Sequence, residues 1–318
     1  MLFFESMPWY AFAMGILVLL GLMLINEVTR RSKNLALFTY IGLPILLTLF
    51  IWPKTSGPGT PMGYWFPWVK TYSALAGVLG FMALRYVKGL NQNKWMLIFP
   101  PAILAINILE AVFRDFECYN FSGIVDGVYI NGGIWNIMNG VAGILSIITI
   151  CGWAGIFIGQ DKNKDMLWPD QMWFWIIAYD IWNFAYVYNC IPDHSFYSGL
   201  ILLLSCTIPA FFIKKGAWLQ HRAQTLALWA MFSLTMPYFA ETSMFAVKSS
   251  HNTVTLTTLS ALALLSNAAV FVYQFKRIHQ LKLNPLKDEI FVDLKGYQEI
   301  IIDNKKDETT QTPVHSGM

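Results

Sequence analysis

The sequence predicts an all-α membrane protein that crosses the bilayer about nine times. Of its 318 residues, 56% are hydrophobic and 13% are charged, whereas an ordinary soluble domain carries about 25% charged residues. Apolar runs of about 20 residues, the length that spans a bilayer as a helix, recur along the chain. A transmembrane β-barrel would instead show shorter segments with alternating polarity. The net charge of +3 does not indicate a nucleic-acid partner. Because of the apolar runs, the expected partner is the lipid bilayer.

Nine segments have the length and composition of membrane-spanning helices, and together they predict a transmembrane bundle over residues 1–281. The segments are 8–28, 35–52, 67–87, 95–114, 130–158, 167–189, 196–213, 223–247 and 254–275. The fifth segment is long, so we expect it to tilt or to begin on the membrane surface. Pro101, Pro209 and Pro237 lie inside segments, and we interpret them as kinks because neighbouring groups can satisfy the freed carbonyls.

Basic residues are distributed unevenly between the segments. Loops after odd-numbered segments carry most of the lysine and arginine, and loops after even-numbered segments carry little. The basic set is Arg30, Arg31, Lys33, Arg85, Lys88, Lys94, Lys162, Lys164, Lys214, Lys215, Arg222, Lys276, Arg277 and Lys282. By the positive-inside rule, this alternation predicts an amino terminus outside and a carboxyl terminus in the cytoplasm. Glu5 precedes the first segment and arginines follow it, which predicts a retained anchor rather than a signal peptide.

Residues 282–318 predict a small cytoplasmic tail. Within residues 289–303, two β-favouring runs flank Lys295 and Gly296, which predicts a hairpin. The last residues are polar and are expected to be disordered.

Polar side chains inside the segments gather in the half of the bilayer that the predicted topology places outside. We expect them to line an outward-facing pocket between the third, fourth, fifth, sixth and eighth segments, where they would bind a substrate or relay protons. The candidates are Lys70, Asn107, Glu110, Arg114, Asn136, Asn139, Trp173, Asp180, Asn183, Tyr188, Tyr238 and Glu241. Asp180 is the deepest acid, and an intramembrane acid is a functional hypothesis by default because it must be protonated, paired or hydrated.

Structural interpretations stand beside this hypothesis. Glu110 and Arg114 are one helical turn apart and could pair with each other. The asparagines could form hydrogen bonds between helices, and the tryptophans could form an aromatic belt. His221 and Arg222, at the start of the eighth segment, could bind lipid headgroups or serve as ordinary cytoplasmic anchors.

Cysteine and motif content narrow the chemistry. Cys118 and Cys190 both fall at predicted outer ends, where they would be either a disulfide or two free thiols. The sequence contains no Cys-x-x-Cys pair, no H-E-x-x-H, no G-x-S-x-G and no G-x-x-x-x-G-K-[ST]. No histidine lies in the middle of a segment, which excludes a haem held by two intramembrane histidines. We therefore expect no metal and no cofactor.

Two stretches carry a resemblance: "FWIIAYDIWNFAYVYNC" in the sixth segment and "GAWLQHRAQTLALWAMF" at the start of the eighth. They resemble a family of bacterial multi-spanning membrane proteins of unknown function. The resemblance implies a location in the bacterial cytoplasmic membrane. It implies no activity and no functional residues.

Three functions remain open at this point. The first is a transporter or receptor for a small amphipathic or cationic solute, bound by Asp180, Glu241 and Glu110. The second is a membrane enzyme acting on a lipid or isoprenoid, with Asp180 and Glu241 as an acid–base pair and Lys70 or Arg114 holding a phosphate. The third is a non-catalytic scaffold that depends on the tail. The ligand and the oligomeric state are not indicated.

Overall fold

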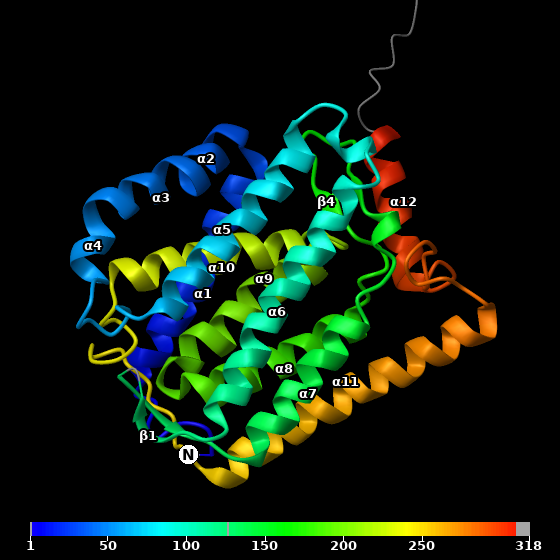
Figure 1. Ribbon diagram of the computed structural model, residues 1–318. Coiled ribbons are helices and arrows are strands. Elements are labelled where there is room, and N and C mark those ends of the chain that lie inside the picture. Colours follow the sequence, from blue (N-terminus) through cyan, green and yellow to red (C-terminus); the bar gives the residue numbers. More distant parts are fainter. Residues whose placement is uncertain (1, 126, 310–318) are drawn as a thin grey trace, which may run out of the picture.

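Helices make up most of the protein in the computed structural model, which describes residues 2–125 and 127–309 (Figure 1). The helices are α1 (Trp9–Arg31), α2 (Lys33–Leu37), α3 (Leu43–Leu46), α4 (Trp52–Thr55), α5 (Trp65–Tyr86), α6 (Phe99–Cys118), α7 (Ile134–Ile148), α8 (Trp173–Cys190), α9 (Leu202–Phe212), α10 (Trp218–Thr235), α11 (Thr253–Leu281) and α12 (Lys295–Thr309). The strands are β1 (Ser122–Val125), β2 (Val128–Asn131), β3 (Phe157–Ile158) and β4 (Met166–Leu167), which form two antiparallel hairpins, β1–β2 and β3–β4. Wider helical turns join α2, α3 and α4 into one continuous run. Another wider turn, Ser195–Ile201, comes directly before α9.

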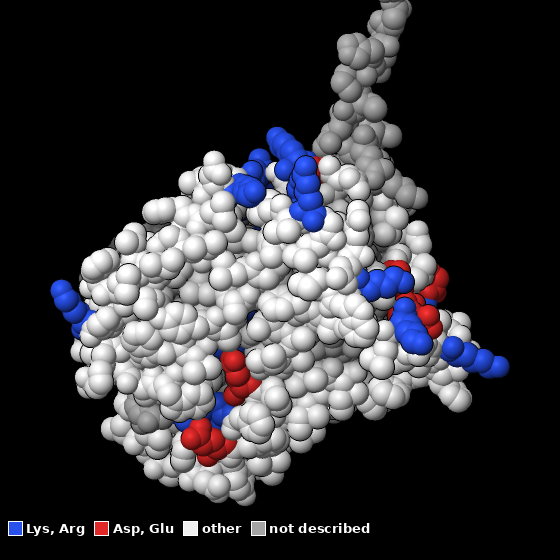
Figure 2. All heavy atoms as spheres, turned by 45° about the horizontal axis from the view of Figure 1, so that its top comes forward, with Lys and Arg blue, Asp and Glu red and all other residues white. Residues whose placement is uncertain are grey.

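The predicted class is confirmed by the length and polarity of these helices. Five helical runs among the described residues are long and apolar enough to cross a membrane: Trp9–Arg31, Lys33–Thr55, Met96–Cys118, Pro192–Phe212 and Thr253–Leu281. Figure 2 shows the matching surface, on which charged side chains gather in a few groups and leave most of the visible face uncharged. The protein is therefore an all-α membrane protein.

The bundle has two distinct ends (Figure 1). The end at which α1 begins carries the β1–β2 hairpin, and we call it the amino-terminal face. The opposite end carries α12 and β4, and we call it the carboxyl-terminal face. Between them, α11 packs against α7 and α8, α6 packs against α7 and α5, and α10 packs against α5 and α9.

Each of the nine predicted segments contains a helix, but two helices end earlier than predicted. The fifth segment was predicted to run to residue 158, whereas α7 ends at Ile148. Gly152, a few residues later, adopts a left-handed conformation, which does not continue a helix and which glycine adopts easily because it has no Cβ. The eighth was predicted to run to residue 247, whereas α10 ends at Thr235. Pro237 therefore does not kink a helix. It follows the end of the helix, and Met236 before it has already left the helical conformation, which proline disfavours in its predecessor.

The other two prolines differ from each other. Pro101 lies in the first turn of α6, where its missing N–H leaves no hydrogen bond unmade, so it is not an internal kink. Pro209 lies inside α9, as predicted.

The predicted tail hairpin is wrong. Residues 295–309 form α12, and Tyr297, Ile300 and Asn304 turn buried side chains to the bundle. Their spacing of three and four residues matches one face of a helix. The β-branched run at Ile300 favours a strand locally, but packing of this face decides the conformation. Residues 304–309 are helical as well, and the predicted disorder of the last residues falls on 310–318, outside the described residues.

An aromatic ladder makes α8 a rigid central helix. Trp175, Tyr179, Trp182 and Tyr186 are buried and follow one face of α8. Their rings succeed one another with centroids 5.5, 5.3 and 6.3 Å apart. Such pairs contribute about 0.5–1.5 kcal/mol each beyond the area that they bury. The ladder therefore fixes the position of the polar residues between its rungs, Asn183 in particular.

A buried ionic cluster joins α1, α5 and α10 at the carboxyl-terminal face. Asp165, from the turn before β4, lies 2.5 Å from Arg30 Nη1 and 3.8 Å from Arg85 Nη2. Gln220 donates to its second oxygen at 2.8 Å, and Glu27 forms a further ion pair with Arg30. Arg30 and Arg85, assigned from the sequence to loops, are thus almost fully buried. We call this group the Asp165 cluster.

Removing the central acid should destabilise the protein strongly. In Asp165→Ala, the guanidinium of Arg85 loses its only carboxylate among the described residues, and an uncompensated buried charge costs about 3–5 kcal/mol. We expect a large fall in the thermal unfolding midpoint in detergent micelles. Glu299→Gln is the control, because it breaks an exposed ion pair with Lys215 and should change little. Equal midpoints for the two variants would contradict this account.

A buried acid, Asp170, helps to hold the C-terminal segment, residues 283–309, to the bundle. Asp170 accepts hydrogen bonds from the backbone N–H groups of Ile290 at 2.5 Å and Phe291 at 2.9 Å. Phe291 packs edge-on against Phe174, with ring centroids 5.3 Å apart. Burial raises the pKa of Asp170 from 3.8 to about 6, although the two N–H donors oppose the shift.

Docking of the C-terminal segment should therefore depend on pH. The docked carboxyl holds more protons than a free one between about pH 4 and pH 6, so docking strengthens as the pH falls through this range and weakens as it rises. We expect amide-exchange protection factors at Ile290 and Phe291 to be higher at pH 5 than at pH 7.5. Asp170→Asn, which does not titrate, should remove the difference. Persistence of the same difference in Asp170→Asn would assign it to another group.

Candidate functional site

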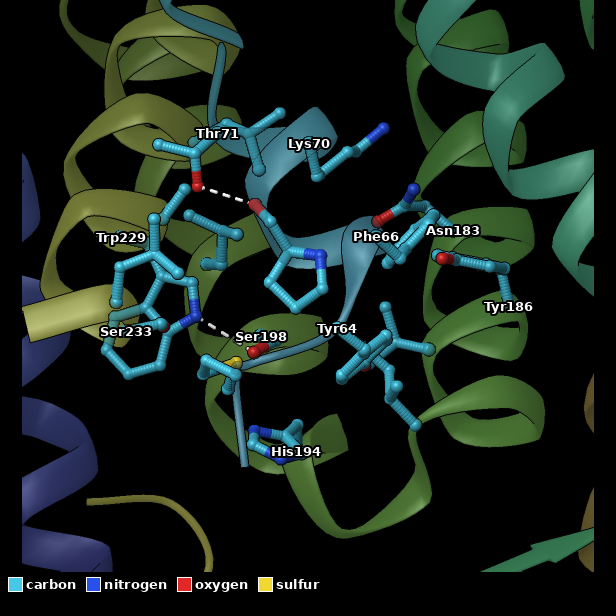
Figure 3. Close-up of a pocket in the computed structure, with 18 of the residues that line it drawn as sticks. Tyr64, Phe66, Lys70, Thr71, Asn183, Tyr186, His194, Ser198, Trp229 and Ser233 are labelled. Carbon is cyan, nitrogen blue, oxygen red and sulfur yellow. Dashed lines mark hydrogen bonds between the residues drawn. The ribbon is translucent and has the colours of Figure 1, made fainter. Parts of the chain in front are cut away.

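A cavity of about 100 Å³ lies between α5, α8, α10 and the turn before α9 (Figure 3). One face of each helix supplies its walls, because the lining residues repeat every three or four positions. The polar and aromatic lining residues are Tyr64, Phe66, Lys70, Thr71, Asn183, Tyr186, His194, Ser198, Arg222, Trp229 and Ser233. Apolar side chains such as Leu226 and Val187 complete the wall. No aspartate or glutamate belongs to this lining among the described residues.

Arg222 is the unusual member of the wall. Its side chain is buried at 5% exposure. Nη2 donates to Asn183 Oδ1 at 3.2 Å, and Nε lies 3.5 Å from the Tyr179 hydroxyl. Nη1 has no hydrogen-bond partner, and in the described part of the chain no carboxylate oxygen lies within 4.0 Å of the guanidinium. The middle of α8 thus faces a buried cation that no carboxylate of the described residues contacts, although Asp180 attracts it from beyond contact distance.

Lys70 lies beside the same cavity but is fully matched. Its amine donates to the carbonyl and the side-chain oxygen of Asn107 at 3.0 and 3.1 Å and to Glu110 Oε2 at 3.2 Å. These three acceptors use all three N–H groups of an ammonium. Lys70 and Arg222 also line a second, smaller cavity of about 30 Å³ between α5, α6 and α10, where Gly77 is one of the apolar lining residues.

Tyr186 and His194 mark two further sides of the cavity. The hydroxyl of Tyr186 is buried without a partner, and Figure 3 shows Tyr186 on the side of the cavity opposite Trp229. His194 lies at the end away from Lys70, with Nε2 3.0 Å from Glu241 Oε1. The cavity wall thus holds two unmatched hydrogen-bond donors, Arg222 Nη1 and the Tyr186 hydroxyl.

The family comparison covers this site together with nearly all of the chain. A family model described as "Family of unknown function (DUF5692)" matches residues 5–303. The chain belongs to this family. The predicted resemblance to a family of unknown function is thereby confirmed. No curated protein and no solved structure matches the chain. The DUF5692 match therefore includes every helix that lines the two cavities.

Two of the predicted candidates line the cavity of this DUF5692 protein, and two more contact one of them. Lys70 and Asn183 line it, and Asn107 and Glu110 hold Lys70 in place. The predicted pairing of Glu110 with Arg114 is wrong, because Glu110 binds Lys70 on the neighbouring helix. Arg114 instead forms an ion pair with Glu117 at 2.6 Å.

The two acids that the hypotheses paired do not come together. Asp180 Oδ2 accepts a hydrogen bond from Thr207 at 2.7 Å, and its Oδ1 is buried without a partner. Glu241 contacts His194, and it stands in a turn because α10 ends before it. Neither acid lines the larger cavity.

The remaining candidates have structural contacts elsewhere. Asn136 and Asn139, on α7, donate to the buried Asp115 on α6 at 3.2 and 2.7 Å. These are hydrogen bonds between helices, as the structural interpretation of the asparagines expects. Tyr188 donates to the carbonyl of Phe3 at 2.6 Å. Two aromatic candidates, Trp173 and Tyr238, are mostly exposed.

The predicted disulfide does not form. Cys118 and Cys190 are buried free thiols, so the other alternative holds. They end α6 and α8 rather than lying in loops. Cys190 Sγ lies 3.4 Å from Asp115 Oδ1, in the same polar group as Asn136.

Sequence reasoning missed Arg222 as a site residue. It assigned Arg222 to the cytoplasmic loop because a charge was taken to mark the start of the eighth segment. In the structure α10 begins at Trp218, so Arg222 and His221 lie inside the helix and are buried. The spacing of Arg222, Leu226, Trp229 and Ser233 on one helical face was the available signal. This spacing would have placed Arg222 on the same helical face as Trp229.

Proposed function

We propose that this protein binds a small anionic solute in the cavity between α5, α8 and α10, as a transporter or receptor of the bacterial cytoplasmic membrane. The observation that carries the proposal is the buried guanidinium of Arg222, whose Nη1 has no hydrogen-bond partner and which, among the described residues, contacts no carboxylate. Burial of an unmatched charge costs several kcal/mol. A bound anion would remove that cost, and arginine is the side chain best suited to hold one.

The proposal reverses the charge of the solute expected from the sequence. Asp180 and Glu241, which were expected to bind a cation, do not line the larger cavity, and Glu110 is already matched by Lys70. The enzyme alternative has less support, because Asp180 contacts Thr207 whereas Glu241 contacts His194. General acid–base catalysis needs both groups within reach of one substrate.

We further propose nine spans, with the amino-terminal face outside. Basic residues still favour the carboxyl-terminal face after Arg30, Arg85 and Arg222, which are buried, are set aside. The remaining loop lysines there are Lys88, Lys94, Lys162, Lys164, Lys214, Lys215 and Lys282, and such a bias marks the cytoplasmic side. In this orientation, a solute would enter the cavity from outside past Tyr64 and His194.

Cysteine labelling in intact cells tests the orientation. Lys54 and Lys88 are exposed at opposite faces, and the four native cysteines are buried free thiols. We expect a membrane-impermeant maleimide to label Lys54→Cys in intact cells and Lys88→Cys only after permeabilisation. The reverse pattern would invert the topology.

Mass spectrometry of co-purifying small molecules tests the anion site. We expect wild type to retain an anion that Arg222→Gln loses by about tenfold or more, because truncating one member of a buried charge pair costs about 2–5 kcal/mol. Arg31→Gln is the matched control, since Arg31 is 60% exposed. A compound lost from Asp180→Asn but kept by Arg222→Gln would instead restore the carboxylate-centred hypothesis.

A further inference from the structure

We infer that the anion binds together with a proton and that Asp180 is the residue that takes up the proton; this rests on the anion site proposed at Arg222. The two side chains lie in one buried layer, where neutral groups link them and no direct contact joins them. A bound anion would therefore compete with Asp180 for the attraction of the same guanidinium.

The contacts of Arg222 on α8 lie on both sides of Asp180. The guanidinium has its Nε 3.5 Å from the hydroxyl of Tyr179, the residue before the acid. Its Nη2 donates at 3.2 Å to Asn183, one helical turn after the acid. Arg222 is thus held at the same level of α8 as Asp180.

Thr207 on α9 links Asp180 to α10 by a second route. Its hydroxyl donates to Asp180 Oδ2 at 2.7 Å. Trp218, one helical turn before Arg222 on α10, donates from Nε1 to the same hydroxyl at 3.1 Å. One turn of α10 therefore reaches the acid through Thr207 and carries the guanidinium at its other end.

Arg222 is the only charged group of the described residues that acts on Asp180. The other titratable neighbours are the Cys206 thiol on α9 and the Tyr179 phenol on α8, and a thiol and a phenol are mainly neutral at pH 7. Asp180 and Arg222 attract each other from beyond 4.0 Å. An anion in contact with the guanidinium would weaken the hold of Arg222 on the ionised acid.

The charges beside Arg222 sum to zero before an anion enters. Lys70 is paired with Glu110 at 3.2 Å, and Asp180 balances Arg222 from a distance. A bound anion adds one negative charge to this buried region, which is costly unless an acid is neutralised. Asp180 is the acid to be protonated, because its Oδ1 has no hydrogen-bond partner, whereas Glu110 is in contact with an ammonium.

This competition fixes the direction of the pH dependence. Protonation of Asp180 leaves the guanidinium without a compensating charge, so the anion binds more tightly as the pH falls. By thermodynamic reciprocity, binding of the anion draws a proton from solvent onto Asp180. A transporter built in this way carries the proton and the anion in the same direction.

Nitrate binding to the full chain in phosphatidylcholine nanodiscs tests the inference. Nitrate is smaller than benzene, which occupies an apolar cavity of about 150 Å³, so it suits a cavity of about 100 Å³. It is an anion at both pH 5.5 and pH 8.5, so any proton taken up belongs to the protein. By equilibrium dialysis, we expect wild type to bind nitrate about tenfold more tightly at pH 5.5 than at pH 8.5. A pH electrode in weakly buffered solution should record proton uptake on binding.

Asp180→Asn removes the proton acceptor. Its side-chain oxygen can still accept from Thr207, so the unfolding midpoint should change little. At pH 8.5 it should bind nitrate about tenfold more tightly than wild type, without pH dependence and without proton uptake. Asp115→Asn is the matched control. It neutralises another buried acid, which does not line the cavity, and should keep the pH dependence of wild type.

His194 is the competing titratable group, because it lines the cavity and an imidazole changes charge near neutral pH. A pH dependence that persists in Asp180→Asn and disappears in His194→Gln would overturn the inference and retain the anion site. Equal nitrate binding by wild type at the two pH values, or weaker binding by Asp180→Asn, would do the same. If wild type binds no more nitrate than Arg222→Gln or empty nanodiscs, the inference and the proposed function both fail.

Discussion

A charged side chain inside this bundle has to meet an opposite charge or a set of hydrogen bonds, because the hydrocarbon region supplies neither. At the carboxyl-terminal face, Asp165 and Glu27 face two buried arginines. Nearer the middle, Lys70 meets Glu110 and both oxygens of Asn107. The Asp165 contacts join helices that are far apart in the sequence, and the Lys70 contacts join the successive long helices α5 and α6. Charge matching therefore also determines which helices are neighbours, and the apolar faces pack around that arrangement.

Arg222 departs from this pattern within a single helix. Gln220, two residues earlier on α10, is satisfied by Asp165 and by the backbone N–H of Met166, so the first turn of α10 stabilises the frame. Arg222 faces the cavity with an unmatched Nη1. A buried polar group without a partner is costly and calls for an explanation, which the proposed anion would supply. The residue that joins the Asp165 cluster and the unmatched guanidinium are thus carried by the same helix, α10.

Composition was sufficient to predict the membrane class and a helix within each segment, because apolar runs of this length have few other uses. The ends of helices were harder to predict. The fifth and eighth segments read as continuous apolar runs, yet α7 and α10 stop at Ile148 and Thr235. The tail was misassigned for the opposite reason. Its isoleucine run favours a strand locally, and only the packing of Tyr297 and Ile300 against the bundle makes it helical.

Pairing of charges could not be predicted from the sequence, since it depends on which helices are neighbours. Glu110 had an available partner one turn away in Arg114, but it binds Lys70 on α5. Lys70 and Asn183 line the cavity because α5 and α8 cover the segments predicted for them. The position of Arg222 was not predicted, and one boundary explains the difference. Moving the start of the eighth helix from residue 223 to Trp218 brings Arg222 into the bundle, which turns an expected acidic pocket into one whose unmatched charge is positive.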